Sequence, residues 1–154
     1  MGRVFFNTRL NFQKIDQIAS YQCLASDSGK TFLVHPVNSG ATAITLPTLA
    51  DAGEGWYCSI VITEDTDGTV GGMNGIVNID FGSGNDVVGM MVSQTDVAGD
   101  YAVNNDDFIN FTAAASPGDK VDIFTDGNRW YAHGMAVDAT PGTGDVLFNT
   151  AAAS

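Results

Sequence analysis

Short runs in which hydrophobic and polar residues alternate follow one another along most of the chain, as in β-strands that turn one face to a core. Clusters of glycine, proline, asparagine and aspartate separate these runs, because such residues accept the backbone angles of tight turns. The pattern predicts strands at 31–35, 41–46, 56–63, 75–81, 87–93, 107–113, 120–125 and 130–135. This predicts a single compact all-β domain, an antiparallel sandwich of jelly-roll type or a small barrel.

The segment from Gly118 to Gly134 is expected to form one β-hairpin. Apolar and polar residues alternate from Val121, Asp126-Gly127-Asn128 supplies the turn, and Trp130 and Tyr131 begin the return strand. Several other strands, such as 57–62, carry apolar residues on both faces. Such a strand is either buried in the centre of the domain or turns its second face to a neighbouring subunit.

The N-terminal segment differs from the rest of the chain in its charge. Arg3, Arg9 and Lys14 are half of the six basic residues, and aromatic and aliphatic side chains lie between them. In 11–20, apolar residues recur at a spacing of three, which makes this segment the best helical candidate. We expect residues 1–18 to form an arm that docks on another protein. The alternative is that they form the first strand or helix of the domain.

The arm prediction sets the domain boundaries. The β-domain is expected to span residues 19–148, and residues 149–154 are expected to form a flexible tail. The sequence contains no internal repeat with the period of a solenoid and no heptads of a coiled-coil shaft.

Charge and hydropathy limit the partners that can be expected. The net charge of −12 disfavours binding to nucleic acid and to anionic membranes. No apolar run approaches the roughly 20 residues of a membrane-spanning helix, and no secretory signal is present, so synthesis in the cytosol is expected. In that compartment Cys23 and Cys58 are expected to be reduced and buried, and a disulfide between them is the alternative.

No motif in the sequence predicts catalysis, a cofactor or a metal site. Gly29-Lys30-Thr31 lacks the preceding glycine of a phosphate-binding loop, and the two histidines, His35 and His133, have no partner at zinc-ligand spacing. Five aspartates in glycine- and asparagine-rich loops offer oxygens for Ca²⁺, but none fits an EF-hand, and solvated turn residues are the expected role. They are Asp65, Asp67, Asp86, Asp106 and Asp107.

Two aromatic pairs, Trp56-Tyr57 and Trp130-Tyr131, are better candidates for a binding surface. Adjacent residues of a strand point to opposite faces, so one member of each pair can fill the core while the other points outward. The outward member is expected at a subunit interface, and stacking on a sugar ring is the alternative.

Two patches, 21–55 and 117–134, resemble a β-module of virion proteins of tailed bacteriophages. The first contains Asp27-Ser28-Gly29-Lys30-Thr31-Phe32 and then a Thr/Ile strand that ends in Leu46-Pro47; the second is the hairpin that turns at Asp126-Gly127. The module occurs in capsid decoration (cement) proteins, head fibres and tail-fibre domains.

The resemblance implies a virion structural protein, not an enzyme, that is made in the host cytoplasm. One β-domain with a short arm is similar to a decoration protein, which binds the major capsid protein on the outer capsid surface as a homotrimer and stabilises the head against internal DNA pressure. The alternative is a head-fibre or tail-fibre module that binds a receptor or a glycan. The residues expected at the capsid or subunit interface are Arg3, Phe5, Phe6, Arg9, Leu10, Phe12, Lys14, Trp56 and Trp130.

Overall fold

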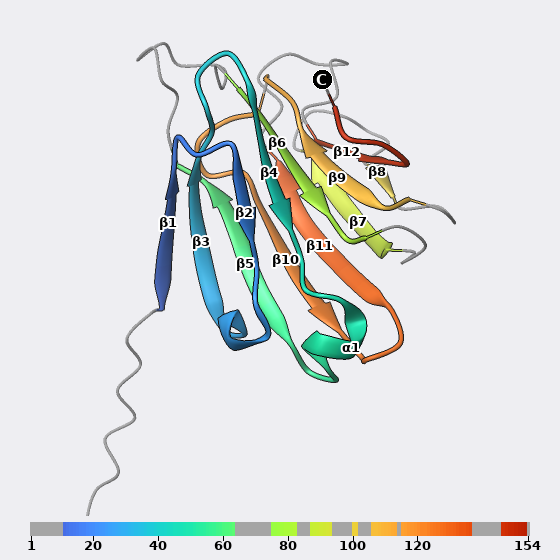
Figure 1. The fold of residues 1–154 in the computed structure, drawn as a ribbon. Helices are drawn as coiled ribbons and strands as arrows, with labels where there is room; N and C mark the ends of the chain where they lie inside the picture. The colour runs from blue at the N-terminus through green and yellow to red at the C-terminus, as the bar shows by residue number, and fades with distance from the viewer. Residues whose placement is uncertain are drawn as a thin grey trace, which may run out of the picture.

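The computed structural model describes residues 11–63, 75–82, 87–93, 100–101, 106–113, 115–136 and 146–153, which form two stacked β-sheets (Figure 1). The strands are β1 (Phe12–Asp16), β2 (Ser20–Gln22), β3 (Lys30–His35), β4 (Ala41–Thr45), β5 (Tyr57–Ile62), β6 (Ile76–Asp80), β7 (Val87–Ser93), β8 (Asp100–Tyr101), β9 (Phe108–Phe111), β10 (Lys120–Thr125), β11 (Trp130–Ala136) and β12 (Val146–Asn149). A 3-10 turn, η1 (Ala25–Asp27), and a short helix, α1 (Leu49–Ala52), connect strands at one end of the sandwich.

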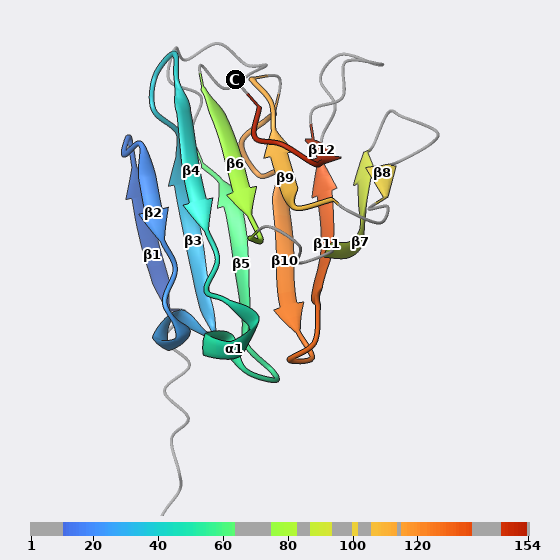
Figure 2. The ribbon, with the colours of Figure 1, turned by 45° about the vertical axis from the view of Figure 1, so that its right-hand side comes forward.

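The first half of the domain, from β1 to β6, winds as a flattened coil (Figure 2). After each strand the chain crosses to the other sheet, so β1, β3 and β5 are parallel neighbours in sheet A, and β2, β4 and β6 are parallel neighbours in sheet B. The strands of sheet A begin at residues 12, 30 and 57, so the successive coils differ in length. Unequal coils leave no fixed period, which is why the sequence shows no repeat.

The second half completes both sheets. Sheet A has the strand order β1-β3-β5-β10-β11-β7-β8, and sheet B has the order β12-β9-β6-β4-β2. The predicted hairpin is confirmed, because β10 and β11 are antiparallel and pair from Lys120↔Met135 to Thr125↔Trp130. Gly127 has φ +87°, a left-handed angle that a side chain would strain, and it provides the turn.

The predicted all-β sandwich is confirmed, with one correction to its topology. The sandwich was expected to be antiparallel, but five of the ten strand pairs in the described part of the chain are parallel. Parallel neighbours arise because the chain crosses to the other sheet between them, whereas hairpins would have made them antiparallel. Among the described strands both sheets are open, with β1 and β8 at the edges of sheet A, so the alternative of a small barrel is wrong.

All eight predicted strands are present, with ends that differ by at most two residues. The predicted helix at 11–20 is wrong, because this segment forms β1 and β2. Phe12, Ile15 and Ile18 do not share a helical face: Ile15 is fully buried, whereas the other two are exposed. The apolar residues spaced three apart would suit a helix, but the segment instead pairs with β3 as a strand. A positive φ at Gln17 ends this strand.

The expected ends of the domain also change. Residues 12–16 belong to sheet A, so the domain begins within the segment that was assigned to the arm, and residues 1–10 lie outside the described part. Of the expected tail at 149–154, Asn149 ends β12, and residues 150–153 follow it with hydrogen bonds to sheet B. Buried asparagines of β6 and β9 hold this segment on the outer face of sheet B.

The core lies between the sheets and is built from the inward residues of each strand. Trp56 and Trp130 meet edge to face with ring centroids 5.4 Å apart, and Phe81 packs on Trp130 at 6.1 Å. All three side chains are buried, with aliphatic residues from both sheets around them. Burial of such aromatic side chains stabilises the fold by roughly 1.5–3 kcal/mol each.

Candidate functional site: the outer face of sheet A

The outer face of sheet A, which points away from sheet B, carries three rows of side chains that run across its strands. The first row is Tyr57, Phe124, Tyr131 and Val88. The second is Phe12, Thr31, Ser59, Asp122, His133 and Met90, and the third is Lys14, Leu33, Val61, Lys120, Met135 and Val92.

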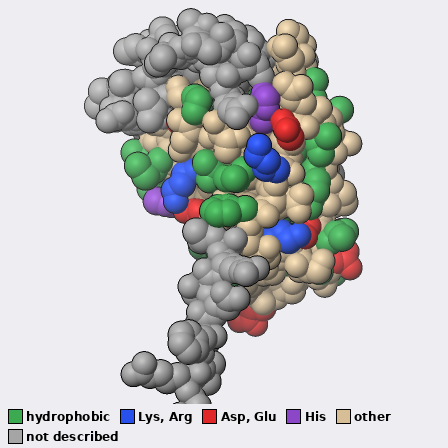
Figure 3. All heavy atoms as spheres, turned by 90° about the vertical axis from the view of Figure 1, so that its left-hand side faces the viewer, with side chains coloured by type: hydrophobic (Ala, Val, Ile, Leu, Met, Phe, Trp, Pro, Cys, Tyr) green, Lys and Arg blue, Asp and Glu red, His purple; other side chains and the backbone are tan. Residues whose placement is uncertain are grey.

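This face holds most of the large hydrophobic side chains that the described part of the chain exposes to solvent. Nine such side chains are exposed, and all but Ile18 and Leu24 lie on this face. The seven are Phe12, Tyr57, Val88, Met90, Val92, Phe124 and Met135. Seen from the side of β1, hydrophobic side chains lie among lysine and histidine side chains (Figure 3). Large hydrophobic side chains that gather on one face of a molecule are typical of a protein interface.

The first row is held in a fixed arrangement. Phe124 and Tyr131 stack with ring centroids 5.1 Å apart and ring planes 11° from parallel. The Tyr131 hydroxyl donates a hydrogen bond to Asp126 Oδ2 over 3.0 Å, which ties the stack to the hairpin turn. Tyr57 lies over Gly29, where an added Cβ atom would be 3.3 Å from the tyrosine hydroxyl oxygen. Aromatic rings that are already ordered lose little conformational entropy when a partner covers them.

The charges on this face balance one another, although the whole chain has a net charge of −12. The outward residues of its strands include two lysines, Lys14 and Lys120, and two aspartates, Asp16 and Asp122. Lys120 Nζ donates to Asp122 Oδ2 over 2.9 Å, and the Ser59 hydroxyl donates to Oδ1 over 2.6 Å. Partial burial alone would raise the pKa of Asp122, but these two hydrogen bonds lower it below its usual range.

Asp16 has a partner of a different kind. Its Oδ1 lies 2.9 Å from Nδ1 of His35 on the neighbouring strand. Among the described residues, the outer face of sheet A is therefore apolar and close to neutral, although the net charge of the whole chain is −12. The centre of this face can be covered by a protein partner without leaving Asp122 unpaired, because Lys120 and Ser59 already bind its carboxylate.

The predicted interface residues fall into three groups. Phe12 and Lys14 lie on this face, in β1 at the edge of the sheet. Trp56 and Trp130 are buried in the core, so their assignment to an interface is wrong. Arg3, Phe5, Phe6, Arg9 and Leu10 lie outside the described residues.

The outward members of the two aromatic pairs are Tyr57 and Tyr131. The core takes the tryptophans, because an indole ring buries more apolar surface than a phenol ring, and because the hydroxyl of Tyr131 has a polar partner outside the core. Sequence reasoning missed the contribution of Phe124, Met135 and β7 to the face. The apolar residues on both faces of the strands were the signal that could have found them.

The Asp27–Phe32 motif has a structural role in this fold. Asp27 Oδ2 accepts from the Leu24 amide over 2.8 Å and its Oδ1 accepts from Lys30 Nζ over 2.6 Å. Gly29 adopts φ +85° and its amide donates to the Tyr57 carbonyl oxygen, which leads the chain into β3. The motif therefore closes the turn between η1 and β3.

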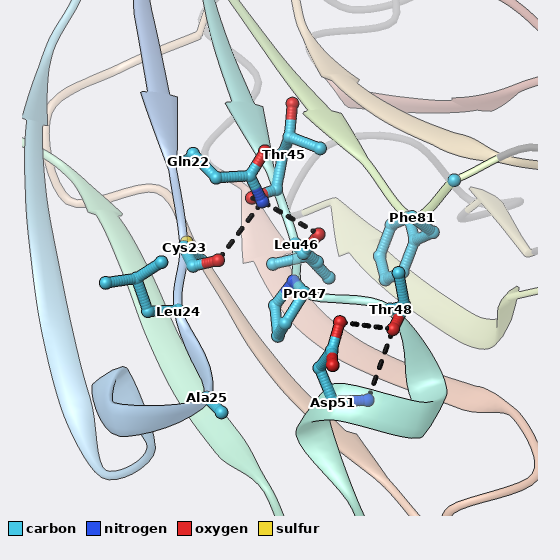
Figure 4. A pocket seen from close by; sticks show the side chains of 11 residues that line it. Gln22, Cys23, Leu24, Ala25, Thr45, Leu46, Pro47, Thr48, Asp51 and Phe81 are labelled. Atoms are coloured by element: carbon cyan, nitrogen blue, oxygen red, sulfur yellow. Dashed lines mark hydrogen bonds between the residues drawn. The ribbon is translucent and has the colours of Figure 1, made fainter.

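A pocket of 480 Å³ opens at the end of the sandwich where η1 and α1 meet (Figure 4). The side-chain amide of Gln22 donates to the carbonyl oxygens of Cys23 and Leu46, and the Thr48 hydroxyl donates to Asp51 over 2.7 Å. These polar groups hold the backbone and one another, so they do not converge on the pocket as ligand-binding groups do. Burial, followed by the nearby Asp27 carboxylate, raises the pKa of the Cys23 thiol to about 12, which makes it a poor nucleophile.

Of the five aspartates that were considered for Ca²⁺, two lie in the described part of the chain. Asp65, Asp67 and Asp86 lie outside the described residues, and Asp106 and Asp107 precede β9. Within the described ranges, no group of three histidine, cysteine, aspartate or glutamate residues is placed to hold a metal ion. Cys23 and Cys58 are both buried, and they are free thiols, as expected.

The comparisons with known proteins do not assign a role to the outer face of sheet A. No protein-family model, curated protein or solved structure matches the chain. Among the described residues, no helix has the length and apolar character needed to span a membrane.

Proposed function

We propose that this chain is a virion structural protein, a capsid decoration protein that binds the major capsid protein on the outer surface of a phage head. The observation that carries the proposal is the outer face of sheet A, whose described residues form an apolar and charge-balanced surface on a chain with a net charge of −12. The two sequence patches that resemble phage virion modules support the same assignment. In this function the protein adds buried contact area between capsid subunits and so resists their separation under internal DNA pressure.

The contact with the capsid is assigned to the edge of the sheet at β1. Phe12 is 52% exposed there, and Lys14 lies two residues further along the same strand. Residues 1–10, with Arg3 and Arg9, precede this strand in the sequence, so basic and aromatic residues lead up to Phe12 and Lys14 along the chain. Cationic groups and an apolar side chain suit an acidic capsid patch. Several weak copies of such a contact on one oligomer bind tightly together.

A second candidate function has one observation in its favour. The exposed aromatic row, with Tyr57, Phe124 and Tyr131, offers ring faces on which sugars can stack. In that case the chain is a head-fibre or tail-fibre module that binds a receptor or a glycan. Loss of residues 1–10 then leaves ligand affinity unchanged, whereas replacement of Tyr57 or Phe124 by serine removes it.

To test the proposal, the purified full chain is mixed with expanded, undecorated capsids of the phage that encodes it. Co-sedimentation and the capsid melting temperature are then measured. Saturable binding at a fixed ratio to capsid subunits, with a higher melting temperature, is expected. A chain without residues 1–10 and a Phe12→Ser, Lys14→Glu variant are expected to lose occupancy, while the exposed-turn variant Asn128→Ala keeps it. Absence of binding by the unmodified chain overturns the proposal.

A further inference from the structure

We propose that the outer face of sheet B is a peptide-binding groove, which recognises the main chain of an extended segment of another protein with small side chains. The recognising groups are the side-chain amides of Asn78 and Asn110, which are register partners on β6 and β9. In this structure residues 150–153 of the same chain occupy the groove as a resident segment. The inference goes beyond the proposed function and does not depend on it, because the proposed capsid contact lies on sheet A.

Asn78 binds the resident segment as a strand would. Its Nδ2 donates to the Ala153 carbonyl oxygen over 3.0 Å, and its Oδ1 accepts from the Ala153 amide over 3.1 Å. Two residues of neighbouring antiparallel strands exchange the same pair of hydrogen bonds. Because every residue except proline carries both main-chain groups, the groove recognises an extended backbone and places no requirement on side-chain chemistry.

Asn110 is only half satisfied by the resident segment. Its Nδ2 donates to the Ala151 carbonyl oxygen over 3.0 Å. Its Oδ1 is buried and has no hydrogen-bond partner, in a residue that is 1% exposed. A buried acceptor without a donor is unfavourable. A ligand that supplies a main-chain N–H to this oxygen, as Ala153 does to Asn78, therefore makes a hydrogen bond that the resident segment lacks.

The resident segment is held in a way that allows its displacement. It runs from β12 past β9 towards β6 (Figure 2). The side chains of Ala151 and Ala152 are exposed, so the hydrogen bonds to the two asparagines, and not apolar burial, hold these residues on sheet B. Segments with few buried apolar contacts open at a lower free energy than the whole fold. A partner segment can then take the place of the resident.

The row that contains the two asparagines continues across sheet B. From Asn78 it passes to Ala43 on β4 and to Ser20 on β2, which are successive register partners. Alanine and serine have small side chains, so a segment that continues in the direction from residue 151 to residue 153 meets no large side chain in this row. The groove therefore suits a segment longer than the resident one, with small side chains of its own.

The test is a titration of the full chain, labelled with ¹⁵N, with the synthetic peptide acetyl-Ala-Ala-Ala-Ser-Ala-Ala-amide, followed by NMR. We expect saturable shifts of the side-chain amide signals of Asn78 and Asn110, and release of the Ala153 amide from its folded position. The matched control is the same peptide with every backbone nitrogen methylated, which keeps the side chains but cannot donate. It should bind at least about tenfold more weakly.

Variants of the chain test the same groove from the protein side. Ala153→Pro removes the amide that donates to Asn78 and weakens the resident segment, so it should raise the affinity for the peptide by about twofold to tenfold. Asn110→Leu should lower that affinity by at least about tenfold, whereas Asn128→Ala, in the exposed hairpin turn, should leave it unchanged. Circular dichroism verifies that each variant is folded.

The outcomes separate this inference from the proposed function. Absence of saturable shifts overturns it, and so does equal binding of the methylated peptide or binding that leaves the Ala153 amide in place. If Asn110→Leu does not fold, the two peptides and Ala153→Pro still decide the result. Because no capsid is present and the groove lies on sheet B, failure here leaves the capsid proposal standing, and failure to coat capsids leaves the groove standing.

Discussion

Asn78 and Ala153 exchange two hydrogen bonds that fix the end of the chain. The side-chain Nδ2 of Asn78 donates to the Ala153 carbonyl oxygen over 3.0 Å, and the Ala153 amide donates to Oδ1 over 3.1 Å. Asn110, the register partner of Asn78 on β9, donates from Nδ2 to the Ala151 carbonyl oxygen over 3.0 Å. Both asparagines are buried, and their side chains bind backbone amide and carbonyl groups of Ala151 and Ala153.

Replacement of Asn78 by alanine should lower the free energy of unfolding by about 2 kcal/mol, because it leaves the amide and carbonyl of Ala153 without their partners. Urea denaturation measures the change. The exposed turn residue Asn128 supplies a matched control, and Asn128→Ala should change stability by less than about 0.5 kcal/mol. Equal stability of the two variants would show that the tail contributes nothing to the fold.

Asp27 should make the protein sensitive to acid. Burial alone would raise the pKa of this carboxyl, but the hydrogen bonds from Lys30 and the Leu24 amide lower it. A lowered folded pKa stabilises the protein above the ordinary carboxyl value of about 3.9, and this contribution is lost as the pH falls through the folded pKa. Asp27→Asn should lose about 1 to 2 kcal/mol at pH 7. Its stability should then fall less steeply below about pH 5.

Urea denaturation of both proteins from neutral to acidic pH tests this prediction. Asp51→Asn, which changes an exposed carboxylate at the start of α1, serves as the matched control. If Asp27→Asn and the unmodified chain lose stability in parallel on acidification, Asp27 is not the group that senses pH.

The buried thiols should be unreactive in the folded protein and should destabilise it at alkaline pH. Burial raises the pKa of Cys23 to about 12 and also raises that of Cys58. A raised folded pKa means that the full contribution to stability is present below the unfolded thiol pKa and is lost as the pH rises toward about 12. One such thiol lowers the free energy of unfolding by at most about 1.4 kcal/mol per pH unit in that window.

Thiol labelling and alkaline denaturation measure these effects. A disulfide-exchange reagent at pH 8 should label neither cysteine until urea is added. The Cys23→Ala variant should lose stability less steeply above about pH 9 than the unmodified chain. Rapid labelling of the folded protein would contradict the burial of Cys23 and Cys58.

The two tryptophans should report a buried environment, because Trp56 and Trp130 are the only tryptophans and both lie in the core. Their emission should be blue-shifted in the folded protein and poorly quenched by iodide. Trp130→Ala should cost about 3 to 5 kcal/mol, since it removes a ring that packs on both Trp56 and Phe81. Tyr131→Ala, its outward neighbour, should cost less. Strong quenching by iodide would show that the tryptophan side chains are exposed to solvent, and would contradict this prediction.

The sequence by itself determined the local structure of this protein. Alternation of apolar and polar residues located the strands, and Asp126-Gly127-Asn128 located the hairpin, because strand and turn preferences depend on neighbouring residues. It also indicated that one residue of each aromatic pair points outward. The pairing of strands depends on residues distant in sequence, so the coil of β1 to β6 and its parallel neighbours did not follow from the pattern.

Only the tertiary structure decided which surfaces are left exposed. Ile15 takes the core position in β1, so the segment that was expected to be a helix forms an edge strand instead. Packing between the sheets then assigned Trp56 and Trp130 to the interior and brought Tyr57 beside Phe124 on the outer face. A surface exists only once distant strands lie in register, so its apolar character and its charge balance are properties of the fold and cannot be read from any one segment.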